Sequence, residues 1–180
     1  PSVLDMSRLN DCPAGVNGRI VADGDDLVFA ATGDKVRVWG VSACSPTWLC
    51  TKPEMDYLAR RLAKMGVNMV RLHVAPYYET TPGIQTDGVH YFISALKRNG
   101  IYAVINWYCL ACARYQSEWN WQGFTPGDPL FSLHLFYPPL QALYKQWAAT
   151  LFGTTNQYTG LPLAQDPALA AIELIDEDNY

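Results

Sequence analysis

The chain has 180 residues, of which 49% are hydrophobic, and a formal net charge of −4. This size and composition suit one globular domain with a substantial core and room for a small appendage. The 13 lysines and arginines are scattered and no stretch approaches the roughly 18 apolar residues that cross a bilayer, so we expect neither a nucleic-acid nor a membrane partner.

Residues 18–40 alternate apolar and polar side chains around two turn signals, Asp23-Gly24-Asp25 and Thr32-Gly33-Asp34. This pattern predicts a small antiparallel β meander, and we expect residues 1–35 to form an N-terminal unit. The next segment, 36–41, is apolar enough to be the first strand of a larger sheet. That sheet is expected to occupy residues 36–180.

Helices and strands alternate strictly after this point. Apolar spacing and stop signals predict helices at 54–65, 89–97 and 138–152, and strands at 67–72, 101–107 and 169–175. A long loop is expected at 108–136. Strands that are apolar throughout and alternate with helices indicate a buried parallel sheet covered by helices.

Polar and aromatic residues stand at the carboxyl ends of successive predicted strands: Arg71 and His73, then Asn106 and Trp107, then Asp176 and Glu177. Several strand ends around one pocket are typical of a barrel. No GxGxxG or GxxxxGK[ST] motif supports a nucleotide-binding sheet. The sequence therefore predicts an α/β fold that is the N-terminal half of a (β/α)8 TIM barrel, with about four βα units after the meander.

Five cysteines are somewhat many for a cytosolic chain, which slightly favours a secreted or extracytoplasmic location. Their disulfide state stays open. The pair Cys109-x-x-Cys112 has no second pair of its kind, and the three histidines show no metal-ligand spacing. We therefore expect no metal and no cofactor.

Several segments together resemble the cellulase-like barrel glycoside hydrolases related to family five. The resemblance covers nearly the whole chain, and its segments are 36–41, 58–73, 99–106, 156–161, 166–174 and Asp176-Glu177. It implies a β-glycoside hydrolase that acts on a polysaccharide or oligosaccharide through two carboxyl groups about 5 to 5.5 Å apart. The sugar, the linkage and the choice between endo and exo action stay open.

The same resemblance implies individual roles. In the family the fourth strand ends in Asn-Glu, so Glu177 is expected to be the general acid/base. Asp176 stands where the family has the asparagine that holds the sugar's 2-hydroxyl, so a carboxylate replaces an amide donor. The family's nucleophile lies on the seventh strand, and this chain ends after the fourth, so we expect a second chain or segment to complete the barrel.

The other candidates each have two interpretations. Arg71 either orients acidic site residues or forms a structural ion pair, and His73 either contacts substrate or is structural. The remaining substrate-binding candidates either meet the sugar or anchor and pack their own loops: Asn106, Trp107, Trp48, Trp119 and Trp121. Trp39 is expected in the core. Because of Asp176 and the absent nucleophile, a non-catalytic carbohydrate-binding or scaffold protein is the alternative function.

Overall fold

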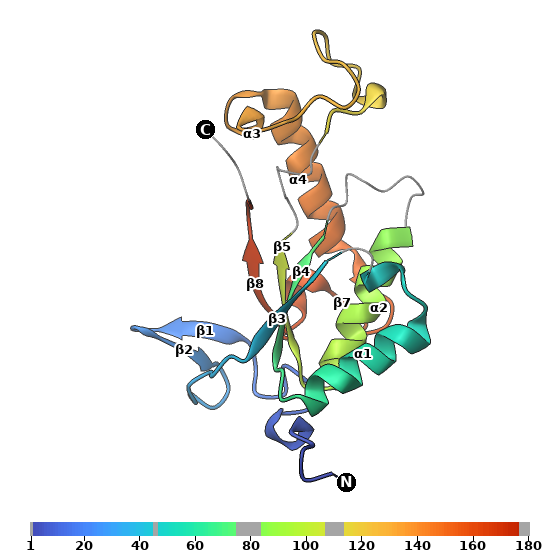
Figure 1. The fold of residues 1–180 in the computed structure, drawn as a ribbon. Helices are drawn as coiled ribbons and strands as arrows, with labels where there is room; N and C mark the ends of the chain where they lie inside the picture. Colours follow the sequence, from blue (N-terminus) through green and yellow to red (C-terminus); the bar gives the residue numbers. More distant parts are fainter. Residues whose placement is uncertain (1, 45–46, 75–83, 107–113, 177–180) are drawn as a thin grey trace.

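The computed structural model describes residues 2–44, 47–74, 84–106 and 114–176. Its centre is a sheet of four strands in the order β3 (Gly40–Cys44), β4 (Met69–His73), β5 (Tyr102–Asn106) and β8 (Leu169–Glu173). All three pairings are parallel, and the order in space follows the order in sequence (Figure 1). This arrangement confirms the predicted α/β fold with the topology of the first half of a barrel.

Helices α1 (Lys52–Lys64), α2 (Ile84–Arg98) and α4 (Pro138–Gly153) supply the apolar partners of this sheet. Leu72 of β4, Ile105 of β5 and Phe92 of α2 are fully buried in one shared core. Side chains alternate along a strand, so the neighbours of Leu72 in sequence, Arg71 and His73, face the opposite side of the sheet. This second side carries the polar residues of the strand ends.

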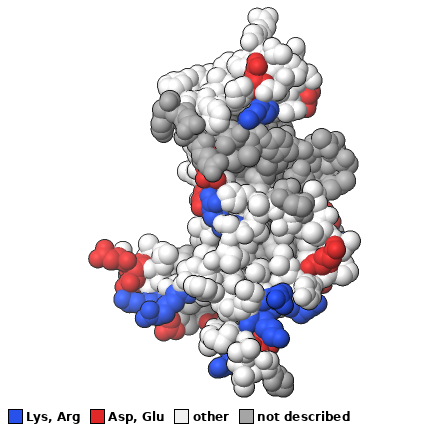
Figure 2. Space-filling view, viewed as in Figure 1, with Lys and Arg blue, Asp and Glu red and all other residues white. Residues whose placement is uncertain are grey.

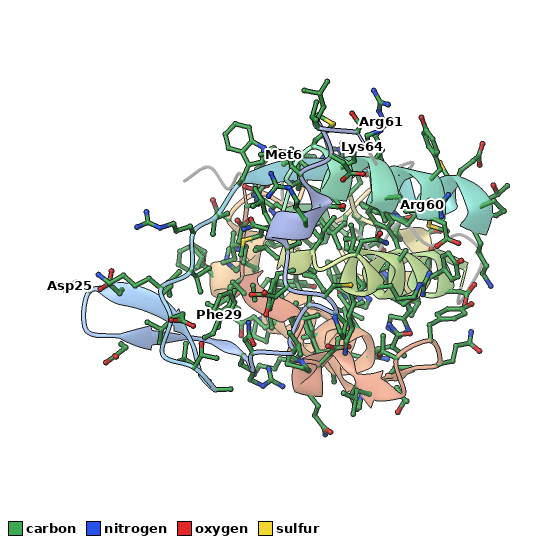
Figure 3. The ribbon with its side chains drawn as sticks, turned by 90° about the horizontal axis from the view of Figure 1, so that it is seen from below. Met6, Asp25, Phe29, Arg60, Arg61 and Lys64 are labelled. Atoms are coloured by element: carbon green, nitrogen blue, oxygen red, sulfur yellow. The ribbon has the colours of Figure 1, made fainter. Side chains whose placement is uncertain are left out.

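Helix α1 shows why the sequence signals were readable. It begins after Thr51, whose backbone N–H donates to Glu54 Oε2 at 2.8 Å in a capping box, and Pro53 occupies the first turn. It ends before Gly66, which has a φ of 79°. A Cβ at Gly66 would lie 3.3 Å from Met6, so the N-terminal segment packs closely on this helix end (Figure 3).

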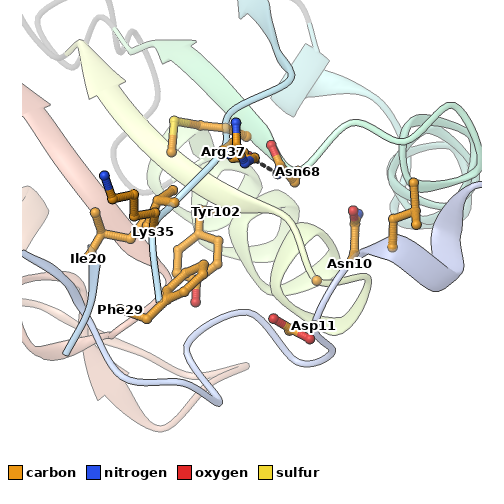
Figure 4. Close-up of a pocket in the computed structure, with 12 residues that line it drawn as sticks. Asn10, Asp11, Ile20, Phe29, Lys35, Arg37, Asn68 and Tyr102 are labelled. Atoms are coloured by element: carbon orange, nitrogen blue, oxygen red, sulfur yellow. Dashed lines mark hydrogen bonds between the residues drawn. The ribbon is translucent and has the colours of Figure 1, made fainter. Parts of the chain in front are cut away.

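The N-terminal hairpin joins β1 (Ile20–Asp23) to β2 (Asp26–Phe29). An isolated antiparallel bridge between Val28 and Lys35 pairs a third short segment with β2, as expected for a meander. Phe29 reaches the sheet, where its ring centroid lies 5.8 Å from that of Tyr102 on β5 (Figure 4). The hairpin therefore contacts the amino-terminal end of the polar side of the sheet.

Shorter elements fill the connections. They are the helical turns η1 (Ser7–Leu9), η2 (Thr47–Leu49), η4 (Ser117–Trp119) and η5 (Leu163–Gln165), the short helix α3 (Leu133–Phe136), and the two-residue strands β6 (Thr155–Asn156) and β7 (Leu161–Pro162). The turn η4 and the helix α3 lie in the predicted loop 108–136. No helix among the described residues is both long and apolar enough to span a membrane.

Helix α2 begins at Ile84 rather than at residue 89. Three further expectations about burial and boundaries were wrong. The first strand of the sheet begins at Gly40 rather than at residue 36. Trp39 is 66% exposed instead of lying in the core, and Ile172 in the last strand is 39% exposed instead of buried. The physical reason is shared, because β3 and β8 are the two edges of the sheet in the described part of the chain, and each has a neighbour on one side only.

Candidate active site

The strand register brings polar residues into one row at the carboxyl edge of the sheet. Cys44 on β3 pairs with His73 on β4, His73 pairs with Asn106 on β5, and Asn106 pairs with Glu173 on β8. Arg71 lies two residues before His73 on the same face. The carboxyl ends point toward the part of the molecule that holds α3 (Figure 1). This row and Arg71 form the carboxyl-edge cluster, together with Asp176, which follows β8.

Arg71 and Glu173 form the best-defined interaction of the cluster. Arg71 Nε donates to Glu173 Oε1 at 2.7 Å and to Oε2 at 2.9 Å, and Arg71 Nη2 also donates to Oε2. The fork of the guanidinium matches the carboxylate, and such charge-assisted bonds are among the strongest in proteins. The hydrogen bonds from Arg71 hold the pKa of Glu173 below its ordinary value, although partial burial and the charge of Asp176 oppose this effect.

Asp176 and His73 extend the cluster. Asp176 Oδ1 lies 3.3 Å from Arg71 Nη2, and its Oδ2 lies 3.5 Å from His73 Nδ1. His73 Nε2 contacts Arg71 Nη1. The direction of this hydrogen bond depends on the imidazole tautomer. Both carboxylates, Glu173 and Asp176, contact the single charge of Arg71.

Asn106 is fully buried, and neither its Nδ2 nor its Oδ1 has a hydrogen-bond partner among the described residues. It lies beside Glu173, and the amide is the weakest of the groups that lower the pKa of that carboxyl. The Asn106 amide and the Glu173 carboxylate do not meet the geometric criteria for a hydrogen bond. Buried amides without partners are rare in folded proteins, so Asn106 needs an explanation.

Glu177 and Trp107 lie outside the described residues, so their predicted roles stay predictions. The segment that leads to Glu177 is nevertheless anchored. Tyr144 of α4 donates its hydroxyl to the backbone oxygen of Leu174 at 2.8 Å. Together with the contacts of Asp176, this bond fixes the chain as it leaves β8 at the carboxyl edge.

The three loop tryptophans differ from the strand-end residues. Trp48 is only 2% exposed and packs in the core, so its ring face is not open to a sugar in this structure. Trp119 and Trp121 contact each other with ring centroids 5.0 Å apart. Both also stack against further rings of the segment after β5, including Tyr115 and, for Trp121, Phe124 and Tyr137. This packing fits the interpretation of a loop held by its own side chains.

Glu173 is the residue that sequence reasoning missed. It was treated as part of an apolar strand, although a charged residue within such a strand is itself a signal. Its partner Arg71 is 102 positions away in the sequence and two strands away in the sheet. No group of three His, Cys, Asp or Glu side chains within the described ranges is arranged to hold a metal ion.

A cavity of about 190 Å³ lies at the opposite end of the sheet, away from the carboxyl edge (Figure 4). Asn68 and Tyr102, which line it, already form internal hydrogen bonds: Asn68 Nδ2 donates to the Arg37 backbone at 2.7 Å, and the Tyr102 hydroxyl accepts from Gly15 at 2.9 Å. On the face drawn in Figure 2, basic side chains gather mainly in this lower part of the molecule. The strand ends, rather than this cavity, hold the acids, Arg71 and Asn106, whose amide has no hydrogen-bond partner among the described residues.

A sheet of consecutive parallel strands with a carboxylate cluster at its carboxyl edge defines a barrel-type α/β protein. The cellulase family, glycosyl hydrolase family 5, matches residues 29–129, which is more than half of the 180 residues. The chain belongs to this family.

Solved structures agree at the level of the fold. An endo-β-1,4-mannanase from Thermotoga petrophila superposes with a TM-score of 0.62 at 19% identity, over 81% of this chain and 36% of its own. A family 5 mannosidase from Rhizomucor miehei gives a TM-score of 0.66 at 16% identity, over 89% of this chain and 48% of its own. The chain thus spans less than half the length of these relatives. No curated protein matches the sequence.

Proposed function

We propose that this chain supplies the acid/base half of a retaining β-glycoside hydrolase that acts on a polysaccharide or oligosaccharide. Membership of family 5 supports glycosidase chemistry, and the observation that carries the proposal is the arrangement of the carboxyl edge. Arg71 binds Glu173 and contacts Asp176 directly before Glu177. A sugar at this edge would meet carboxylates, one cation and a partnerless amide, which are the groups that hold hydroxyls and move protons.

In the proposed mechanism Glu177 protonates the leaving glycosidic oxygen, and a second carboxylate, supplied by a segment or chain that completes the barrel, attacks the anomeric carbon. Glu177 then removes a proton from water as the glycosyl intermediate is hydrolysed. Arg71 positions Asp176 and offsets part of the local negative charge. His73, Asn106 and Trp107 contribute to the wall of the sugar site, and no cofactor takes part.

The test compares the full-length protein with the 180-residue chain on β-glucoside and β-mannoside oligosaccharides. We expect turnover by the full-length protein, at least a thousandfold loss in Glu177→Gln with the circular dichroism spectrum unchanged, and no turnover by the 180-residue chain. Turnover that survives Glu177→Gln would contradict the role of this residue. Sustained turnover by the 180-residue chain would place the second carboxylate within it.

A non-catalytic carbohydrate-binding or scaffold protein is the second candidate, and Asp176 in place of the family's asparagine is the observation that favours it. An intact full-length protein that binds oligosaccharides in calorimetry but turns none of them over would support this alternative.

A further inference from the structure

The carboxyl-edge cluster has more negative than positive charge among the described residues. Glu173 and Asp176 both contact Arg71, which is the arginine or lysine side chain that the described part of this cluster contains. One cation is therefore shared by two carboxylates. A net negative charge of about one remains at a partly buried edge, where it is screened less than it would be in water.

Within the described part of the chain, Asp176 is less completely paired than Glu173. Glu173 receives two bonds from Arg71 Nε at 2.7 and 2.9 Å. The contacts of Asp176 are 3.3 Å to Arg71 Nη2 and 3.5 Å to His73 Nδ1, which are longer than well-formed charge-assisted hydrogen bonds. The Asp176 side chain is only 20% exposed, so water reaches it poorly. Among the described residues, Asp176 thus has acceptor capacity that its contacts do not use.

Asn106 gives a second and independent indication of a ligand. Its side chain is fully buried, and neither amide atom has a hydrogen-bond partner within the described part of the chain. The strand register places it between His73 and Glu173, on the side of the sheet that carries the cluster. A buried amide without a partner is unfavourable, so a bound polar group that pairs with it would recover the lost free energy.

The two observations specify complementary ligand chemistry. Asp176 can only accept hydrogen bonds and is the less completely paired carboxylate among the described residues, so its best partner is a cation that donates. Asn106 offers one donor and one acceptor, which suits a sugar hydroxyl. A protonated amine donates up to three hydrogen bonds and brings the missing charge, whereas a hydroxyl brings one donor and an N-acetyl group brings no charge.

We propose that the carboxyl edge selects β-glycosides of amino sugars, with the ammonium group bound to Asp176 and a neighbouring hydroxyl paired with Asn106. The proposal rests on the proposed function, because it names the substrate class of the same site. Asp176 is the specificity-determining residue. Its carboxylate favours the charged sugar, and an amide at this position would favour a neutral one.

The test measures kcat/KM of the full-length protein on β-1,4-linked tetrasaccharides of glucosamine, N-acetylglucosamine, glucose and mannose at pH 6. We expect glucosamine to exceed N-acetylglucosamine at least tenfold, and this preference to weaken as the salt concentration rises. In Asp176→Asn the ratio of glucosamine to glucose should fall at least tenfold. Asp56→Asn is the matched control, since Asp56 pairs with Arg98 on the helices, and it should leave the ratio unchanged.

Equal values for glucosamine and N-acetylglucosamine would overturn the inference, as would a ratio that Asp176→Asn does not change. Turnover of neutral sugars in either case would leave the glycosidase proposal standing. If the wild-type protein turns over none of the four, the glycosidase proposal fails, and calorimetric binding of the same tetrasaccharides decides the inference. A glucosamine preference that disappears in Asp176→Asn would support it, and no preference would overturn it.

Discussion

Arg71 is the residue on which the carboxyl edge depends. It comes from β4, binds a carboxylate on β8, and contacts Asp176 and His73 at the same time. A lysine could not replace it, because a single ammonium lacks the planar fork that meets both oxygens of Glu173. Both sequence-based interpretations of Arg71 are compatible with this arrangement, since one side chain forms an ion pair with Glu173 and also contacts Asp176, whose site role is a prediction.

Glu173→Gln should destabilise the 180-residue chain by about 1 kcal/mol at neutral pH, a small value because the Arg71–Glu173 pair is partly exposed to solvent. The effect depends on pH. Arg71 keeps the pKa of Glu173 below its ordinary 4.5, so this carboxylate stabilises the fold above pH 4.5 and the contribution is lost as pH falls through the folded-state pKa. Urea unfolding of both proteins at pH 7, 5, 4 and 3 measures the difference.

The difference between wild type and Glu173→Gln should therefore shrink in acid. The control is Glu118→Gln, which removes an exposed carboxylate that accepts a long hydrogen bond from the Ser117 hydroxyl at 3.4 Å. It should change the free energy of unfolding by no more than a few tenths of a kcal/mol at any of these pH values. A Glu173→Gln effect that is the same at pH 7 and pH 3 would contradict the role assigned to its ionised form.

At the scale of elements, the ion pair between Lys97 and Asp166 connects α2 to the turn before β8. Lys97 Nζ lies 2.8 Å from Asp166 Oδ1, and Asp166 is fully buried and also accepts the Ala168 N–H at 2.9 Å. Asp166→Asn keeps an acceptor for Ala168 but leaves the ammonium of Lys97 without its counter-charge. Removing one partner of a buried pair typically costs about 3–5 kcal/mol, and we expect about 3 here because Lys97 is partly exposed.

Thermal or urea unfolding of Asp166→Asn measures this cost. The matched control is Asp26→Asn, which breaks the pair of Asp26 with Lys35 at 2.6 Å, where both side chains are largely exposed. It should cost less than 1 kcal/mol. The double variant Lys97→Met with Asp166→Asn should recover part of the loss, because no buried charge is then left alone. Similar losses for the two single variants would mean that burial does not decide the strength of the pair.

The helix and strand boundaries show which features of the fold can be predicted from the sequence. Helix α1 was predictable within two residues because its capping box, Pro53 and Gly66 are local signals. The start of β3 was missed because residues 36–39 have strand-like side chains, and only pairing with β4 decides where the ladder begins. Arg71 and His73 were found because a strand end is a local feature. Glu173 was missed because its importance comes from a partner across two strand pairings.

At the scale of the whole molecule, the sheet has two free edges and one side without covering helices in the described part of the chain. Trp39 beside β3 is 66% exposed, and Leu174 and Ile175 after β8 are 65% and 41% exposed. Exposed strand edges with apolar side chains pair readily with other chains. The chain covers only 36% to 48% of the relatives it resembles, in which the fold continues beyond the region matched.

We therefore expect the isolated 180-residue chain to associate with itself at high concentration. Sedimentation at about 100 µM should show species larger than the 20.1 kDa monomer, because the β3 and β8 edges can pair between copies. Trp39→Lys and Leu174→Lys should each weaken this association at least tenfold, since a charge on an edge opposes pairing. Val3→Lys is the control, because Val3 is 93% exposed on the N-terminal segment, away from both edges. A monomeric wild type at this concentration, or an equal effect of all three variants, would show that the edges do not attract a partner.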